Sequence, residues 1–375
     1  MQIVEISRKN IIHNLRQFRK RVGKRVEIMA VVKSNAYGHG IREVAKIVSQ
    51  NGADWLGVNS LEEGLLLRKI NLRQPILILG YIPLNEIKEA IRHNLSFVVY
   101  NLEAIKRANR VAARLKKRAK VHLKIETGTY RQGINIADLE EFVRLCLVEK
   151  NIIIEGIYTH YANIEDTLDH RFALSQLRKF KKATKLVNRL GVQPFCHTAC
   201  SAAIILYPET FFDIVRLGIG LYGLWPSREV KILANRSKKA KIELKPALSW
   251  KTKIAQIKPV AKGATVGYGR TFRANRGMKI AIIPVGYWDG YDRKLSNCGR
   301  VLVKGQFAPI VGRVCMNMLM IDVSEIPNIG IEEKVVLIGK QGKNEITTEE
   351  LAEKMGTINY EVVTRINPSI PRKVV

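Results

Sequence analysis

Cysteine and acidic residues are scarce in this chain of 375 residues. Five cysteines form an odd set without a CxxC pair, which is typical of a reducing compartment and not of a disulfide framework. Cys196, His197 and Cys200 lie close together, but three candidate ligands without a second cluster make a weak zinc motif, so we expect no metal site. No signal peptide is visible and no apolar run approaches membrane-spanning length, so we expect a cytoplasmic protein without a membrane partner.

The shortage of acidic residues leaves a formal net charge of +30. Such a charge would suit a nucleic acid or an anionic membrane surface. The basic clusters at 116–118 and 178–182, however, lie in helical stretches that almost lack aromatic residues able to stack on bases. We therefore expect solvated helix faces and no nucleic-acid partner, with salt-dependent retention on a nucleic-acid column as the test of the alternative.

Short apolar runs alternate with amphipathic stretches up to about residue 225. Eight strand-helix units of this kind predict a parallel sheet closed into a (β/α)8 TIM-type barrel. A doubly wound sheet is the competing architecture, but no glycine-rich dinucleotide turn follows the first strand. The expected strands are 26–33, 55–58, 76–79, 97–100, 121–126, 152–160, 194–197 and 212–216, and the clearest helices are 62–69, 102–117, 138–148 and 168–190.

The pattern of the sequence changes after residue 234, where the alternation of strand-like and helix-like stretches ends. A polar connection at 238–241 precedes β-rich runs punctuated by glycine, which predict a second, mainly β domain. We therefore divide the chain into a barrel at 1–235 and a β domain at 236–375. The expected strands of the β domain are 248–257, 280–285, 301–303, 307–311 and 334–338, with one helix at 348–355.

The first predicted strand ends in Lys33, and small, polar and glycine residues follow at once. A primary amine at the mouth of a buried strand is a position from which a Schiff base can form. On these residues alone, Lys33 could equally be a lysine that extends its charged end into solvent.

The stretch 30–40, AVVKSNAYGHG, resembles the cofactor-attachment segment of the alanine racemases, which use pyridoxal 5′-phosphate (PLP). The resemblance continues in order through both predicted domains. It implies Lys33 as the Schiff-base lysine and Tyr37 as a ligand of the PLP phosphate. It also implies a homodimer in which the second domain of each subunit completes the site of the other.

Three barrel segments add further residues by resemblance. Lys124 is a lysine that can be carbamylated, and its carbamate would orient Arg131 toward the phenolic oxygen of PLP and the substrate. His160 lies against the face of the PLP ring. Arg216 faces the pyridine nitrogen, which would stay unprotonated because arginine keeps its own proton. From position alone, these residues could be a solvated lysine, a core histidine and a surface ion-pair arginine.

The phosphate of PLP has several implied ligands at the ends of later elements. Ser201 opens a probable helix, where a hydroxyl and free backbone N–H groups suit a phosphate, although an ordinary N-cap is the alternative. Gly218 and Ile219 offer backbone N–H groups. By resemblance, Tyr360 in the second domain is a further phosphate ligand.

The β domain supplies the second half of the implied site. Tyr268 lies between two glycines, a pattern of turns, and by resemblance it is the second catalytic base. Bringing a tyrosine pKa from about 10 to about 7 needs roughly 4 kcal/mol, which we expect from the cations His160 and Arg216. By resemblance, Tyr287 lies near the substrate entrance and Met316 at the substrate carboxylate.

The resemblance implies two-base PLP-dependent interconversion of L- and D-alanine, supplying D-alanine for peptidoglycan synthesis. The chain departs from the family pattern at Glu126, Cys200 and Asn317, where aspartate, asparagine and aspartate are usual. A broad-spectrum amino-acid racemase of the same fold and a non-catalytic PLP-binding protein remain alternatives, although the latter would lack the β domain.

Overall fold

The computed structural model describes residues 2–237 and 240–375, and these form two compact units. The barrel unit comprises residues 10–36 and 44–246, and the β unit comprises residues 2–9, 37–43 and 247–375. The segments 2–9 and 37–43 therefore pack with the β unit, although both precede the boundary expected at 235. The polar connection expected at 238–241 lies partly outside the described residues.

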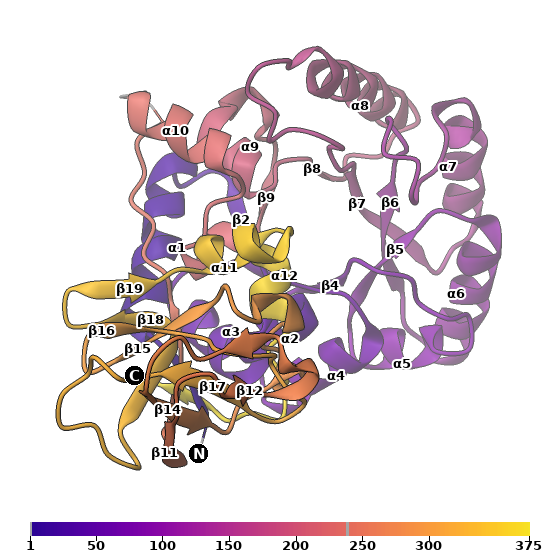
Figure 1. The fold of residues 1–375 in the computed structure, drawn as a ribbon. Coiled ribbons are helices and arrows are strands. Elements are labelled where there is room, and N and C mark those ends of the chain that lie inside the picture. The colour runs from indigo at the N-terminus through magenta and orange to yellow at the C-terminus, as the bar shows by residue number, and fades with distance from the viewer. Residues whose placement is uncertain (1, 238–239) are drawn as a thin grey trace. The chain divides into compact units, whose positions relative to one another are not determined.

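Eight parallel strands form the barrel, and the first seven pair with one another in the order of the chain (Figure 1). The last strand returns to the first, and Asp213 N donates to Cys196 O (3.0 Å) across the remaining seam. The predicted barrel is confirmed, with all eight strands close to their expected bounds. They are β2 (Glu27–Val31), β3 (Trp55–Val58), β4 (Ile76–Ile78), β5 (Ser96–Val99), β6 (Ala119–Lys124), β7 (Ile152–Tyr158), β8 (Phe195–His197) and β9 (Ile214–Leu217).

Helices follow the strands and cover the outside of the barrel (Figure 1). In α6, Asn101 caps the N-terminus by accepting from Ala104 N (2.9 Å), while Ile105, Ala108 and Val111 face the core. Local capping and a 3.6-residue apolar period thus specify the helix together. The helices are α1 (Arg8–Val22), α3 (Ile41–Ser49), α4 (Leu61–Lys69), α5 (Ile87–Arg92), α6 (Leu102–Arg114), α7 (Leu139–Val148), α8 (Arg171–Arg189), α9 (Ser201–Leu206) and α10 (Arg228–Arg236).

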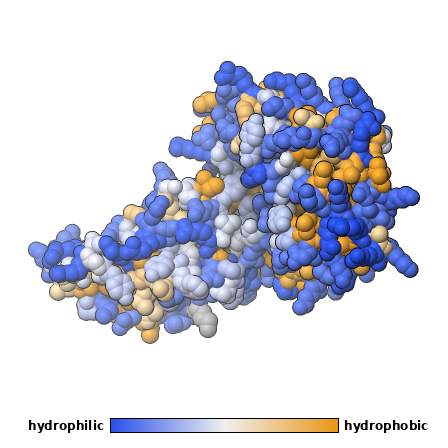
Figure 2. All heavy atoms as spheres, turned by 90° about the vertical axis from the view of Figure 1, so that its right-hand side faces the viewer, coloured by the Kyte–Doolittle hydropathy of each residue, from blue (hydrophilic) through white to orange (hydrophobic). Residues whose placement is uncertain are grey.

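Cationic side chains gather on the outer helices of the barrel. Helix α8 carries seven lysines and arginines and no acidic residue. Hydrophilic side chains cover most of the side of the molecule shown in Figure 2, which includes α6 and α7. No helix of the described residues is long and apolar enough to span a bilayer.

The β unit contains a seven-stranded, a three-stranded and a two-stranded sheet. The expectation of one strand at 248–257 was wrong, because the chain changes sheets there. Ile254 N donates to Glu333 O in one sheet, and Ala255 N donates to Ile282 O in the next. The elements are β1 (Ile3–Ile6), β10 (Leu248–Lys253), β11 (Gln256–Val260), β12 (Thr265–Val266), β13 (Phe272–Arg273), β14 (Met278–Ile283), β15 (Arg300–Val303), β16 (Gln306–Pro309), β17 (Leu319–Asp322), β18 (Lys334–Gln341), β19 (Asn344–Ile346), α11 (Thr348–Met355), α12 (Asn359–Thr364) and β20 (Arg372–Val374).

The N-terminal strand β1 was not expected from the sequence. It pairs antiparallel with β10 and parallel with the edge strand β20, so it is an internal strand of the largest sheet of the β unit. Val4 and Ile6 are fully buried, whereas Ile3 and Glu5 are partly exposed. A strand of four residues is too short to show a clear apolar period in the sequence. Its partners also lie more than half the chain away, so no neighbouring segment indicates the pairing.

Replacing Ile6 by alanine should lower the free energy of unfolding by about 2–5 kcal/mol, the usual cost of truncating a buried isoleucine. Chemical denaturation measures the effect. Ile3→Ala, in the same strand but partly exposed, is the matched control and should cost less. Equal losses from both substitutions would contradict the burial of Ile6 on the inner face of β1.

Candidate active site

The segment after Lys33 forms a left-handed turn, α2 (Lys33–Tyr37). Ser34, Asn35, Ala36 and Tyr37 have φ values of 53–54°. This region costs non-glycine residues about 1–2 kcal/mol each, so neighbouring groups must hold the turn in place. Glu63 of α4 does so, because its Oε1 accepts hydrogen bonds from Ser34 N (2.6 Å) and Asn35 N (3.4 Å).

Lys33 lies two residues beyond the end of β2, in a cationic part of the barrel. Burial is the main influence that lowers its pKa, and the charge of Arg131 adds to it. The carboxylate of Glu63 acts in the opposite direction, and Arg216 lowers the pKa slightly further. An amine whose pKa is lowered in this way is more readily available as a nucleophile and as a base.

Lys124 points into the protein and is only 6% exposed. Its Nζ donates to Gln132 Oε1 (3.0 Å) and lies 5.7 Å from the centroid of the Tyr158 ring. Burial, together with Arg131 and Arg216, lowers the pKa of Lys124 to about 8. Lys124 is therefore buried and is not the solvated strand lysine that its position alone allowed, while its carbamylation stays a prediction.

The loop that carries Arg131 is organised by Glu126. Its Oε1 accepts hydrogen bonds from Gly128 N (2.5 Å) and Thr129 N (2.7 Å). Burial alone would raise the pKa of Glu126, but the backbone N–H donors outweigh it and lower the pKa. The longer side chain that this chain has in place of aspartate still caps the turn before Arg131.

Arg216 of β9 is buried, and its two terminal nitrogens are fully engaged. Nη1 donates to His197 Nδ1 (2.9 Å) and His197 O (3.0 Å), and Nη2 donates to Thr159 O (2.8 Å) and Thr198 O (2.9 Å). No carboxylate of the described residues forms an ion pair with it, so the surface ion-pair alternative is wrong. The remaining donor, Nε–H, has no hydrogen-bond partner among the described residues.

His160 follows β7 and also lies beside Arg216. Its Nδ1 is 3.2 Å from Arg216 Nη2, which can only donate, so a proton on this nitrogen would place two donors face to face. Burial and then the charges of Arg216 and Arg131 lower the pKa of His160 well below its ordinary value. His160 is therefore neutral, and the expectation that it would help to stabilise a tyrosinate as a cation was wrong.

Ser201 starts α9 and ties this helix to the segment after β9. Its Oγ accepts from Gly218 N (3.1 Å) and Gly220 N (3.2 Å). Ser201 and Gly218 thus lie together, as a shared phosphate site requires, while Ile219 follows directly. The amide of Gly218 is already donated to Ser201, so its expected role toward phosphate stays a prediction.

Two expected phosphate ligands meet within the β unit. The ring centroids of Tyr37 and Tyr360 are 6.2 Å apart. The chain approaches α12 closely at Gly38, where φ is +81° and a Cβ atom would lie 1.9 Å from Val363 O. Only glycine fits there, which explains the small residue that follows Tyr37.

Tyr268 is highly exposed on the β unit, at 73% of its surface. The flanking Gly267 and Gly269 have φ values of 74° and 70°, which glycine adopts without steric cost. A Cβ atom on Gly269 would lie 2.8 Å from the guanidinium carbon of Arg313. The two glycines therefore allow a tight turn, which leaves the phenol side chain of Tyr268 exposed.

Tyr287 and Met316 are brought together by backbone pairing. Tyr287 N donates to Cys315 O and Trp288 N to Met316 O, both at 2.9 Å. Tyr287, Trp288 and Met316 all have exposed side chains, at 41%, 64% and 55%. An exposed group of large apolar side chains of this kind is typical of a binding surface.

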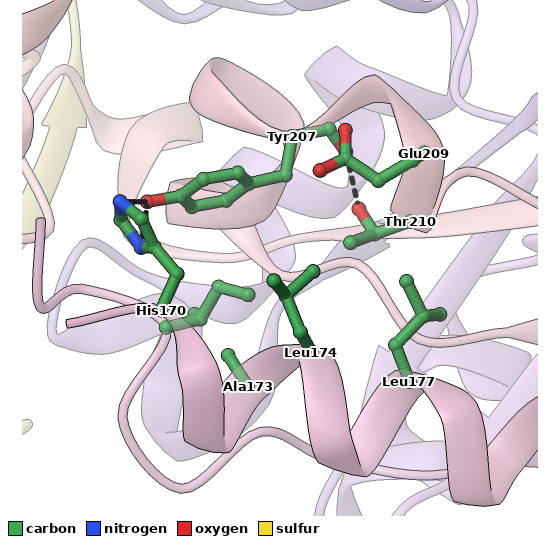
Figure 3. A pocket seen from close by; sticks show the side chains of 8 residues that line it. His170, Ala173, Leu174, Leu177, Tyr207, Glu209 and Thr210 are labelled. Carbon is green, nitrogen blue, oxygen red and sulfur yellow. Dashed lines mark hydrogen bonds between the residues drawn. The ribbon is translucent and has the colours of Figure 1, made fainter.

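A small pocket elsewhere in the barrel unit contains none of the expected site residues. His170 Nδ1 and the Tyr207 hydroxyl are 2.8 Å apart at its edge, and Leu174 and Leu177 form its floor (Figure 3). No group of three or more His, Cys, Asp or Glu side chains in the described ranges could hold a metal ion.

Comparison with known families assigns both units. The profile described as alanine racemase, N-terminal domain matches residues 6–226, and the profile of the C-terminal domain matches residues 247–374. The chain belongs to the alanine racemase family. An alanine racemase of Leptospira interrogans is 41% identical over 374 residues, covering 99% of this chain and 95% of the relative.

Solved structures of racemases have the same fold throughout. An alanine racemase of Bacillus anthracis with bound L-Ala-P gives a TM-score of 0.93 at 36% identity, covering 100% of this chain and 95% of that one. A histidine racemase of Leuconostoc mesenteroides gives 0.88 at 32% identity, covering 100% and 98%. The racemase fold therefore accommodates more than one amino acid.

Glu63, Glu155 and His122 were not singled out from the sequence. Glu63 lies in an ordinary amphipathic helix, and its contact with Ser34 depends on how α4 packs beside β2. His122 and Glu155 lie in strands that we predicted to be buried, so both could be taken for ordinary core residues. In the racemase barrel, a polar residue within an apolar strand run is the signal that could have marked them.

Glu63→Gln should lower the pKa of Lys33 further, because it removes the one carboxylate that favours the ammonium form. The pH dependence of reductive methylation of Lys33 in cofactor-free protein, followed by peptide mapping, measures this shift. The glutamine Oε1 can still accept from Ser34 N, which preserves the turn. The adjacent, exposed Glu62→Gln is the matched control, and an equal shift from it would contradict a specific Glu63–Lys33 interaction.

Proposed function

We propose that this member of the alanine racemase family binds PLP through Lys33 and interconverts L- and D-alanine. The observation that carries the proposal is a lysine of lowered pKa at the end of a barrel strand, surrounded by cations. When bound, PLP supplies a conjugated ring that takes up the electron pair released on loss of the α-proton. The product D-alanine would serve peptidoglycan synthesis. A cytoplasmic location stays a prediction.

The charge of the barrel site fits PLP. Lys33, Lys124, Arg131 and Arg216 perturb one another electrostatically, and Glu63 and Glu126 are the acidic residues that counter them. An excess of positive charge, two of whose carriers (Lys124 and Arg216) are buried, favours a ligand with a phosphate and a phenolate. The free Nε–H of Arg216 is a donor suited to a ring nitrogen that accepts. These features support the proposed roles of the barrel residues as PLP ligands.

A carbamate on Lys124 fits the same charge distribution. The lowered pKa makes the neutral amine available to attack CO₂, forming an N–C bond with release of one proton. The resulting anion would lie among Arg131, Arg216 and Lys33 and would offset their repulsion. The carbamate would then orient Arg131 toward the phenolic oxygen of PLP, which is the role that the family resemblance implies.

Racemisation needs a proton acceptor on each face of the substrate's α-carbon, and Lys33 can serve only one. We infer that Tyr268 of a second subunit serves the other face. Its exposure and its rigid glycine-flanked turn support a role across a dimer interface. Tyr287 and Met316, also exposed, would then approach the substrate of the partner's site.

The strictness for alanine is a separate matter, because a histidine racemase has the same fold. Cys200 and Asn317 replace residues usual in the family, and Asn317 removes a charge expected near the entrance. Assays should therefore include histidine beside alanine. Alanine remains our proposed substrate, since the relatives that resemble the full chain are named alanine racemases.

Borohydride reduction of the PLP-loaded enzyme should place the pyridoxyl group on Lys33, as peptide mapping will reveal. Lys33→Ala should lose the visible absorbance of the Schiff base, and racemisation of alanine should fall by roughly 10³-fold or more. Lys88→Ala, an exposed lysine on α5, is the control and should change neither. A pyridoxyl label on another lysine would reject the assignment.

Tyr268→Phe should keep bound PLP but reduce racemisation by about 10²–10⁴-fold, the usual contribution of a general acid–base group. Mixing this variant with Lys33→Ala then tests the shared site. Random pairing gives heterodimers with one intact site, so activity should recover to about a quarter of the wild type. No recovery in verified heterodimers would show that Lys33 and Tyr268 act from the same subunit.

A further inference from the structure

A chain of polar side chains leads from Arg216 through the interior of the barrel. Arg216 Nη1 lies 2.9 Å from His197 Nδ1, and His197 Nε2 lies 2.9 Å from His122 Nδ1. His122 Nε2 then lies 3.2 Å from Glu155 Oε2. Both histidines are completely buried, and Glu155 is 11% exposed. None of the proposed roles toward PLP accounts for His122 or Glu155.

Both ends of the chain have a fixed hydrogen-bonding character. A guanidinium can only donate, so His197 Nδ1 must accept. At the other end, Lys120 Nζ lies 2.9 Å from Glu155 Oε1, and the Ser96 hydroxyl donates to Oε2. Burial alone would raise the pKa of Glu155, but the bonds from His122 and Ser96 outweigh it and lower the pKa to about 2. Glu155 is therefore ionised and can only accept.

These two ends permit one arrangement of protons. Since His197 Nδ1 accepts, its proton is on Nε2 and is donated to His122 Nδ1. The proton of His122 is then on Nε2 and is donated to Glu155. An additional proton on either ring would place two donors face to face. Both imidazoles are consequently neutral, in agreement with the lowering of both pKa values, mainly by burial.

The surrounding residues hold both rings in this orientation. His197 stacks on Tyr158 with centroids 4.7 Å apart and an interplanar angle of 2°. Trp55 packs edge-on against His122 at 5.6 Å. Gly156 leaves the space for His122, because a Cβ atom there would lie 2.1 Å from its Nδ1. The rings are thus constrained by packing as well as by hydrogen bonds.

We propose that Glu155 is a positioning residue that, through His122 and His197, fixes Nδ1 of His197 as the acceptor for Arg216. The proposal rests on the proposed function, in which Arg216 faces the ring nitrogen of PLP. With Nη1 held by His197, the guanidinium keeps Nε–H as its free donor. Glu155 therefore acts on the cofactor from the interior of the barrel, without touching PLP or substrate.

The wild-type enzyme provides the first test. Its histidines are labelled with ¹⁵N, and correlations across the imidazole–imidazole hydrogen bond identify His122 and His197 by NMR. Both protons should be found on Nε2, and both Nδ1 atoms should be unprotonated. A proton on Nδ1 of His197, or a charged ring, would overturn the inference without any substitution.

Glu155→Gln provides the second test, because it should reverse the chain. Lys120 can only donate, so it should attract the glutamine oxygen and leave the NH₂ group facing His122. His122 would then carry its proton on Nδ1, and His197, protonated on Nδ1, would present N–H to the N–H of Arg216, so the hydrogen bond between them would be lost. We expect the His197 proton to move to Nδ1. We expect kcat to fall about 10–100-fold, the usual loss when a residue that orients a functional group is replaced. The KM for alanine should change little.

Two controls separate positioning from general damage. Lys120→Gln removes the ion pair but keeps the carboxylate, so both tautomers should be retained. Glu140→Gln makes the same chemical change at an exposed ion pair on α7 and should leave kcat unchanged. An unchanged kcat in Glu155→Gln despite reversed tautomers would overturn the inference alone. A wild type with the expected tautomers but no racemisation of alanine would instead overturn the proposed function.

Discussion

A buried arginine without a carboxylate at hydrogen-bond distance is the constraint on which the candidate site depends. Arg216 donates to carbonyl and imidazole acceptors from the ends of β7 and β8, which are neutral groups. Neutral acceptors fix the direction of a guanidinium without neutralising its charge. The charge therefore remains available to a ligand, and it also lowers the pKa of Lys33, Lys124 and His160 around it.

The backbone strain in the turn after Lys33 is countered by hydrogen bonds to a neighbouring carboxylate. Four successive left-handed residues would not persist in an isolated peptide, yet Glu63 binds two of their amides. One carboxylate thus stabilises the backbone that positions the lysine and moderates the electrostatics of its amine. The two effects cannot be optimised independently, because moving Glu63 would change both.

The sequence was most informative where a pattern is local. Strand-sized apolar runs predicted all eight barrel strands, and the segment at Lys33 led to the correct family. Contacts between distant segments were beyond such reasoning. Strand β1 has no periodicity of its own, the chain changes sheets between Ile254 and Ala255, and His160 is neutral because it is buried beside the charge of Arg216. Each of these properties depends on a contact between segments that are distant in the sequence and meet only in the folded protein.

The pairing of β1 with β10 and β20 has a consequence for biosynthesis. Strand β1 leaves the ribosome before the barrel, but both of its partners are translated only after the whole barrel. Until then, its backbone donors and acceptors have no sheet to join, and Val4 and Ile6 have no core to enter. The barrel can fold while the chain is still growing, whereas the largest sheet of the β unit closes only after β10 and β20 have been translated.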